Sequence, residues 1–253
     1  MKRYTKIPAL MLSVMLMLVS CDKEDDLETA IHYGPETVIG DGTARAWVQT
    51  TPDKKPLAIG LSISKKIIKS LPKEMIEYKL DLPEGLDIAP YDHVVLDWNP
   101  MGHPPATYET PHFDMHFYMI PDAERKAIPA GPQEHAAAFE ESYMPSTYFS
   151  QVEAVPAMGV HWLSIYSPEL NGHHFTQTYI VGANNDKIIF YEPMITLAYL
   201  QGLDKGQKNV FKVDQATKVQ RDGYHPLSYT IYNSSDEDEY VVSLTDLKFR
   251  KGE

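Results

Sequence analysis

Cysteine is nearly absent from this chain of 253 residues, which contains a single one, Cys21. A disulfide within one chain is therefore impossible. Catalysis by a thiol is excluded for everything that follows residue 21, because no other thiol is present there. That part of the chain therefore has no thiols for binding a soft metal ion.

The local motifs of several enzyme classes are absent as well. The chain has no Gly-x-Ser-x-Gly elbow, no Walker loop, no Gly-x-Gly-x-x-Gly and no His-Glu-x-x-His. Catalysis by serine and histidine, or by paired carboxylates, stays open, since the members of such sites can lie far apart in the sequence.

The first twenty residues have the features of an export signal. Lys2, Arg3 and Lys6 precede an apolar run of thirteen residues at 7–19, as in the charged and hydrophobic regions of a secretory signal. As a helix this run would be about 20 Å long, shorter than a hydrocarbon core of about 30 Å. We therefore expect segment 1–20 to be a signal peptide that is cleaved.

The end of this segment, from Leu18 through Val19 and Ser20 to Cys21, resembles the lipobox of bacterial lipoproteins. The resemblance implies that Cys21 takes a diacylglycerol and becomes the first residue of the mature chain; a chance buried cysteine is the alternative. We expect a lipoprotein of the cell envelope, anchored to the outer membrane and either periplasmic or exposed at the surface. A homo-oligomer is possible but not required.

The residues after Cys21 are strongly charged, with the sequence DKEDD at 22–26. Such a stretch is too polar to pack, so we expect 21–40 to be a lipidated cysteine followed by an acidic, solvated tether. The stretch is also similar to the acidic export signal of many lipoproteins of the bacterial cell surface. An ordinary linker explains it equally well.

Positive charge is scarce. The chain carries 23 Lys and Arg against 35 Asp and Glu, and the signal takes away three positive charges and no negative ones, which leaves a net charge of −15. Nucleic acid and anionic lipid head groups would be repelled, whereas metal ions would be attracted. We expect no nucleic-acid partner.

Long helical patterns are also few, whereas the chain contains 19 prolines and 16 tyrosines. We predict a single domain at 41–253 of the α+β, β-dominated class, as an antiparallel sandwich or barrel-like domain with a few short helices. Polar turns at 183–186 and 233–238 predict two hairpins. The expected strands are 44–50, 57–63, 76–82, 93–98, 112–120, 160–166, 175–181, 187–191, 227–232 and 240–244, and the expected helical pieces are 64–71, 122–128 and 134–141.

Seven of the ten histidines fall between residues 103 and 174, and the segment PHFDMHFY at 111–118 is the centre of this group. In a strand, His112, Asp114 and His116 share one face, and the alternate aromatic and methionine side chains form the apolar face. Neighbours two apart are about 6.6 Å apart and those four apart about 13 Å apart, so a flat strand offers one ion a His and Asp pair only.

A bend would bring more of this face to one ion. A bulge near Asp114 would bring His112 and His116 together. A helix would do the same, but Pro111, Pro121 and the aromatic content argue against one.

Further ligands must come from elsewhere in the chain. His161 follows a tight turn at the start of an expected strand, and Glu192 stands before a proline at the end of another. His103, in a loop between glycine and proline, is a secondary candidate. Each of these residues alone is more often an ordinary surface or core side chain, but together with the 112–116 face they favour a metal site.

The motifs PHFDMHFY, MGVHW and EPMIT, at 111–118, 158–162 and 192–196, resemble a poorly characterised TTHB-type bacterial lipoprotein-like family. The resemblance spans roughly residues 90–200 and implies a β-rich exported domain of unknown activity. The chain is more distantly similar to cupins, although the His-x-His pair of cupins is missing. His112-x-Asp114 with a distal His161 is also similar to the ligand order of iron oxygenases that use two histidines and one carboxylate.

These observations predict an exported protein that binds a divalent metal, most simply zinc, through His112, His116 and His161. Asp114 and Glu192 would be further ligands or would orient the imidazoles. Four protein ligands would indicate a binding or structural site, whereas an open position would indicate a metal-dependent enzyme, either a hydrolase or cupin-like. A surface interaction module without metal is the third possibility.

Overall fold

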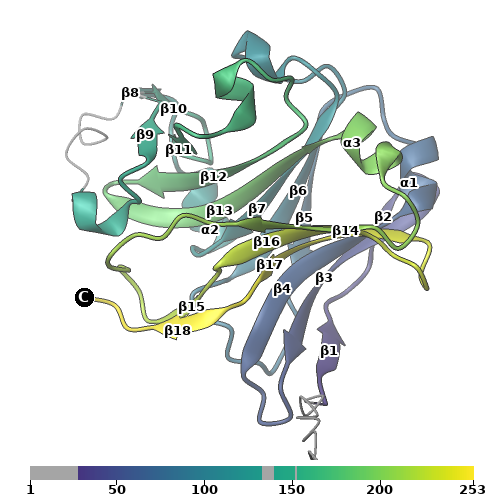
Figure 1. Cartoon of the computed structure of the whole chain (residues 1–253), viewed down its shortest axis with the longest axis horizontal. Helices are drawn as coiled ribbons and strands as arrows, with labels where there is room; N and C mark the ends of the chain where they lie inside the picture. Colours follow the sequence, from purple (N-terminus) through teal and green to yellow (C-terminus); the bar gives the residue numbers. More distant parts are fainter. Residues whose placement is uncertain (1–27, 133–139, 152) are drawn as a thin grey trace, which may run out of the picture.

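The architecture is that of two antiparallel sheets packed face to face, as a computed structural model of the chain shows (Figure 1). The structure describes residues 28–132, 140–151 and 153–253. The expected signal peptide, Cys21 and the charged stretch at 22–26 lie outside these residues, as does most of the helical piece expected at 134–141.

The first sheet brings the two ends of the described chain together. Figure 1 shows the N-terminal strands β3 and β4, in blue, beside the C-terminal strands β16 and β17, in yellow. In spatial order, the strands of this sheet are β1 (Ala30–Tyr33), β3 (Gly42–Thr50), β4 (Pro56–Ser64), β17 (Glu239–Thr245), β16 (Ser228–Asn233) and β14 (Lys208–Lys212). The short strand β2 (Thr37–Ile39) also pairs with β3.

The second sheet contains the histidine-rich segment. The strand β7 occupies an interior position, flanked by β6 and β13. In spatial order the strands are β5 (Ile76–Asp81), β6 (His93–Asn99), β7 (His112–Tyr118), β13 (Lys187–Thr196), β12 (Gln177–Asn184), β11 (Val160–Ser164) and β9 (Tyr148–Ser150).

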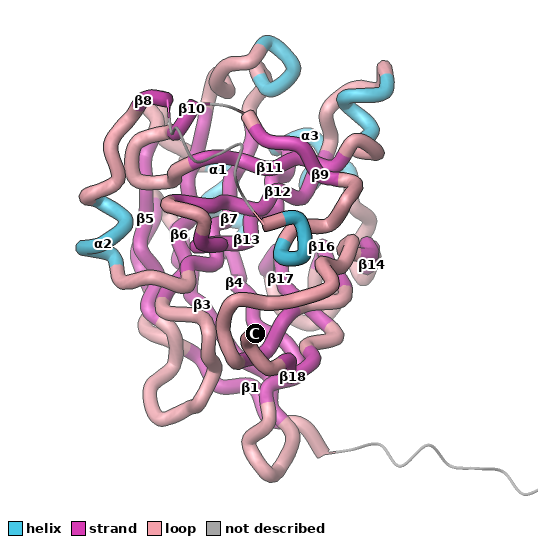
Figure 2. Tube along the Cα trace, turned by 90° about the vertical axis from the view of Figure 1, so that its left-hand side faces the viewer, coloured by secondary structure: helices cyan, strands magenta, loops and turns pink. Residues whose placement is uncertain are grey.

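The remaining elements are short and lie around the sheets (Figure 2). They are the paired strands β8 (Gly131–Pro132) with β10 (Glu153–Ala154) and β15 (Gly223–His225) with β18 (Lys248–Arg250), the α-helices α1 (Lys65–Lys69), α2 (Asp122–Lys126) and α3 (Leu197–Gly202), and the 3-10 helices at Ala106–Tyr108, Glu141–Tyr143 and Pro168–Asn171.

The main hydrophobic core lies between the two sheets. It takes alternate side chains from each sheet, such as Ala46 and Val48 of β3 and Phe113, Met115 and Phe117 of β7. This alternation is the period-two pattern of strands that bury one face against a facing sheet. The prediction of a β-dominated antiparallel fold is confirmed in its sandwich form, because the described strands form no closed barrel.

The predicted elements agree with the structure at most positions, including both hairpins, which are β12 with β13 and β16 with β17. The predicted extent of the tether is wrong, because residues 30–33 and 37–39 form β1 and β2 and pair with β3. In the described part of the chain, no helix combines the length and the apolar character needed to cross a membrane.

Candidate metal centre

The outer face of β7 carries His112, Asp114 and His116, as its alternation predicted. Their exposed fractions are 0%, 4% and 0%, because loops cover this face of the second sheet. Polar side chains buried to this degree require partners. The partners of His112 and Asp114 differ from those of His116.

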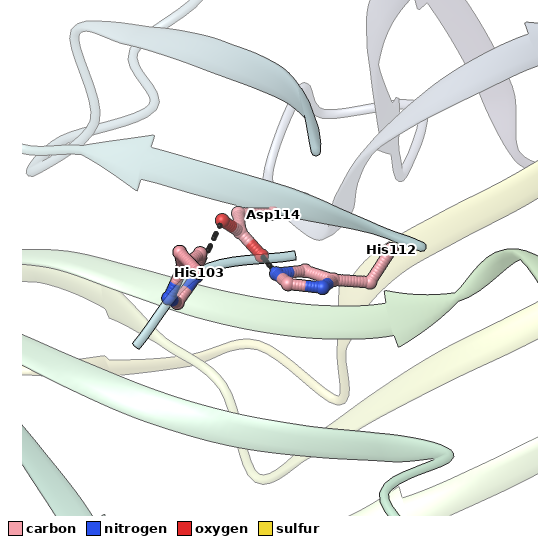
Figure 3. Close-up of side chains that lie close together, drawn as sticks. All are labelled: His103, His112 and Asp114. Carbon is pink, nitrogen blue, oxygen red and sulfur yellow. Dashed lines mark ion pairs between the residues drawn. The ribbon is translucent and has the colours of Figure 1, made fainter. Parts of the chain in front are cut away.

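The first group consists of His103, His112 and Asp114 (Figure 3). The Asp114 carboxylate lies between the two imidazoles, with its Oδ1 3.1 Å from His112 Nε2 and its Oδ2 3.4 Å from His103 Nε2. His103 comes from the loop between β6 and β7, whereas the other two residues come from β7 itself. One ligand atom from each residue lies within 4.8 Å of those of the other two.

Backbone carbonyls orient both imidazoles of this group. His112 Nδ1 donates a hydrogen bond to the Thr110 carbonyl at 2.6 Å, and His103 Nδ1 donates one to the Pro104 carbonyl at 2.9 Å. A neutral imidazole with its proton on Nδ1 presents a lone pair at Nε2. Both Nε2 atoms face Asp114, so they are arranged as in histidines that bind a metal.

The second group consists of His116, His161 and Glu192, all of them buried. They lie on β7, β11 and β13. Oε1 of Glu192 is 3.3 Å from His116 Nε2, and its Oε2 is 3.5 Å from His161 Nε2. The opposite nitrogen of His116, Nδ1, lies 3.0 Å from Asp97 Oδ2 on β6. A carboxylate behind a histidine in this way fixes the ring and raises its basicity as a ligand.

The five predicted residues thus form two groups, and the structure does not bring His112, His116 and His161 to one point. The prediction of a bulge near Asp114 is wrong. Strand β7 pairs with β6 in an unbroken register from His112 to Tyr118. In an extended strand, residues four apart remain about 13 Å apart. Each histidine of β7 therefore belongs to a separate group.

Two residues near the groups were missed by sequence reasoning, Asp97 and Asn99. Asn99 Nδ2 donates a hydrogen bond to Asp114 Oδ2 at 2.8 Å. The signal was present in the expected strand 93–98, where alternation places Asp97 opposite the apolar Val94, Leu96 and Trp98. Which strand would lie beside residues 112–118 could not be read from that pattern.

Burial and charge act in opposite directions on the titration of these groups. Burial raises the pKa of Asp114, but the adjacent imidazoles of His103 and His112 outweigh it and hold the pKa well below its ordinary value. Burial lowers the pKa of His116, yet Glu192 and Asp97 raise it to about 9. For Glu192 burial prevails over the charge of His116, and its pKa rises to about 8.

The geometry of both groups fits a metal ion. In each group one ligand atom from each residue lies within 4.8 Å of those of the other two, and in tetrahedral coordination with bonds of about 2.0–2.1 Å the ligand atoms lie about 3.3–3.4 Å apart. The four histidine-to-carboxylate distances of 3.1, 3.4, 3.3 and 3.5 Å run to a different oxygen for each histidine, so each carboxylate lies between its two imidazoles. His112 Nε2, Asp114 Oδ1, His116 Nε2 and Glu192 Oε2 are buried and make no hydrogen bond to the described residues, although unpaired buried polar atoms are costly.

A cavity of about 490 Å³ lies over both groups. Its wall includes His103 and Asp114 of the first group and His161 and Glu192 of the second, together with Asp97. Cavities of this size accommodate small molecules. The arrangement therefore offers two sets of three candidate ligands, of which His103, Asp114, His161 and Glu192 line one common space.

Residues 53–98 match the family described as "TTHB210-like: Hypothetical protein TTHB210". This segment runs from the turn before β4 to β6 and ends before the three motifs of the sequence resemblance. The match supports the similarity to a TTHB-type family of unknown function. Searches among curated proteins and solved structures give no match. The more distant similarity to cupins stays a suggestion.

Proposed function

We propose that the protein is an exported lipoprotein of the outer membrane that binds divalent metal, and specifically zinc, in the two groups on the outer face of the second sheet. The observation that carries the proposal is the convergence of imidazole nitrogens and carboxylate oxygens in two groups, each of which contains two buried ligand atoms that make no hydrogen bond to the described residues. A metal ion between these atoms satisfies them all.

Zinc fits the ligand chemistry best. Each group supplies two imidazole nitrogens and one carboxylate oxygen, a set that zinc accepts with tetrahedral geometry. No thiol is present after Cys21, which argues against iron–sulfur centres. The excess of carboxylates in the chain adds a general attraction for cations.

The number of ligands favours an open site over a closed one. Three protein ligands leave one position of a tetrahedral ion free, as in catalytic zinc sites, whereas structural sites have four. The free positions would face the cavity. A metal-dependent hydrolase is therefore the second candidate function, in which a bound ion supplies a polarised water and Asp97 holds His116 in place.

Export and anchorage depend on Cys21 in this proposal. A Cys21→Ala variant should lose incorporation of labelled fatty acid and should leave the membrane fraction. Ser20→Ala is the matched control and should retain both properties. Labelled lipid on the Cys21→Ala protein would contradict lipidation at this residue.

Elemental analysis of the full chain, purified without a polyhistidine tag or chelator, tests the metal sites. We expect about two zinc ions per chain, and the loss of one ion in His112→Ala and of the other in His161→Ala. His93→Ala is a matched control, because His93 is buried in the same sheet and lies outside both groups. If the protein retains no metal after addition of micromolar zinc, the metal sites are refuted, and a surface interaction module without metal is the remaining possibility.

A further inference from the structure

The cavity over the two metal-binding groups has both ligand and apolar side chains in its lining. The ligand side chains are His103, Asp114, His161 and Glu192. The apolar side chains, which form the apolar wall, are Met75, Tyr108, Val155, Met158, Ile180 and Met194, and Ile180 and Met194 pair with Glu192 and Asp114 in the sheet. An occupant must therefore combine a head that binds a metal with an apolar body.

The apolar wall continues to the protein surface. Met75 is 61% exposed and Val155 is 38% exposed, although both line the cavity. Exposed apolar side chains beside a cavity are typical of a binding site for an apolar group. A sugar or another highly hydroxylated ligand would find few hydrogen-bond partners along this wall.

The charge of the cavity restricts the head group. No lysine or arginine is among the described residues that line it, and Glu77 on its wall is paired with the buried Arg125. The other acids of the wall are Asp97, Asp114 and Glu192, each of which lies beside a histidine of the two groups. Two divalent ions among these three carboxylates leave an excess of one positive charge, which a ligand with one negative charge neutralises.

We infer that the cavity binds a small monocarboxylate with an apolar body, whose carboxylate coordinates the metal while the body contacts the methionine-rich wall. This inference rests on the proposed function, because the ions supply all the positive charge of the site. A dianion would restore an excess of negative charge inside a buried space, and a neutral alcohol would leave the positive charge unbalanced.

The test uses the full mature protein in detergent, loaded with Co²⁺ in place of zinc, because the visible absorption of cobalt reports its coordination. The probes are hexanoate, adipate and 1-hexanol, which share a six-carbon chain. Hexanoate should change the cobalt spectrum saturably, and the other two should leave it unchanged at tenfold higher concentration. An equal response to adipate or hexanol would overturn the inference.

Two methionine variants test the apolar wall. Met75→Glu introduces a negative charge beside the cavity and should weaken hexanoate binding by about tenfold or more. Met101→Glu is the matched control, since Met101 is 79% exposed and does not line the cavity, and it should bind hexanoate as the parent does. Unchanged binding in Met75→Glu would place the ligand outside this cavity and refute the assignment.

Metal content measured on the same samples distinguishes a failure of the metal sites from a failure of monocarboxylate binding. A protein that holds cobalt or zinc but shows no response to hexanoate refutes the monocarboxylate and leaves the metal sites intact. A protein that holds neither metal refutes the proposed function and the inference together. Hexanoate that binds equally well to the metal-free protein refutes coordination of its carboxylate.

Discussion

The two faces of strand β7 are equally buried and chemically opposite. Phe113, Met115 and Phe117 face the other sheet, and the His112, Asp114 and His116 side chains face the loops that cover the second sheet. Burial removes apolar side chains from water at a gain of about 1.5–3 kcal/mol each. Burial of polar groups without full partners costs a comparable amount.

Burial alone therefore does not identify what a residue contributes to stability. The inner face stabilises the sandwich under all conditions. The outer face contains groups whose hydrogen bonds are incomplete, so its contribution depends on what binds there. Stability of the inner face should be independent of metal, and that of the outer face should follow metal occupancy.

The largest expected effect concerns the inner face. Phe117→Ala removes a ring that is 0% exposed and should lower the free energy of unfolding by about 3–5 kcal/mol, because it leaves a cavity in the core. Urea denaturation of the metal-free protein measures this change. Tyr166→Ala, at a residue that is 71% exposed, should change stability by about 0.5 kcal/mol or less. Equal losses in the two variants would contradict the assignment of Phe117 to the core.

A single zinc site should give the next largest effect, through the outer face. At a free concentration one hundred times Kd, each occupied site should add about 2.7 kcal/mol to the free energy of unfolding. Thermal unfolding with zinc, and again after addition of a chelator, measures the difference. Asp114→Asn should lose only the contribution of the first group. An unchanged melting temperature in excess zinc would contradict the proposal that the outer face is stabilised by metal.

Glu192→Gln should have opposite effects on the two forms of the protein. Because burial raises the pKa of Glu192 to about 8, its ionised form is disfavoured in the folded state. The penalty grows as pH rises from the ordinary pKa of a glutamate to about 8, so the variant should stabilise the metal-free protein by on the order of 1 kcal/mol near pH 8.

The same variant should weaken zinc binding, since it removes a ligand of the second group. Urea denaturation at pH 5 and pH 8, each with and without zinc, measures both the stabilisation of the metal-free variant and the loss of stabilisation by zinc. A metal-free variant that is less stable than the parent at pH 8 would show that Glu192 stabilises the fold as an ion, contrary to the comparison.

The smallest effect concerns a buried histidine outside both groups, His225. Burial lowers its pKa below the ordinary value, so the unfolded chain takes up the proton first as the solution is acidified. The stability that depends on neutral His225 is present above about pH 6.5 and is lost as pH falls below it. His225→Gln should reduce this loss in urea titrations between pH 7 and pH 5, whereas the exposed His173→Gln should not. Identical pH profiles for the parent and His225→Gln would refute this role.

The secondary structure near the site was largely predictable because it depends on neighbouring residues. Alternation in 112–118 placed His112, Asp114 and His116 on one face, and the structure has them there. The start of the domain was placed too late, because residues 30–39 lack a strong pattern and become strands by pairing with β3. Pairing with a distant strand is a tertiary event.

The sequence by itself determined that the chain is β-rich and acidic, that a single cysteine follows an apolar segment, and that β7 has one apolar and one polar face. The division of the polar residues into two groups depends on the tertiary structure. The order of β6, β7, β13, β12 and β11 places Glu192 near His116 and His161, and the loop before β7 places His103 near Asp114. Periodicity along a chain gives the direction of a side chain, whereas its partners depend on the register between strands that are far apart in the sequence.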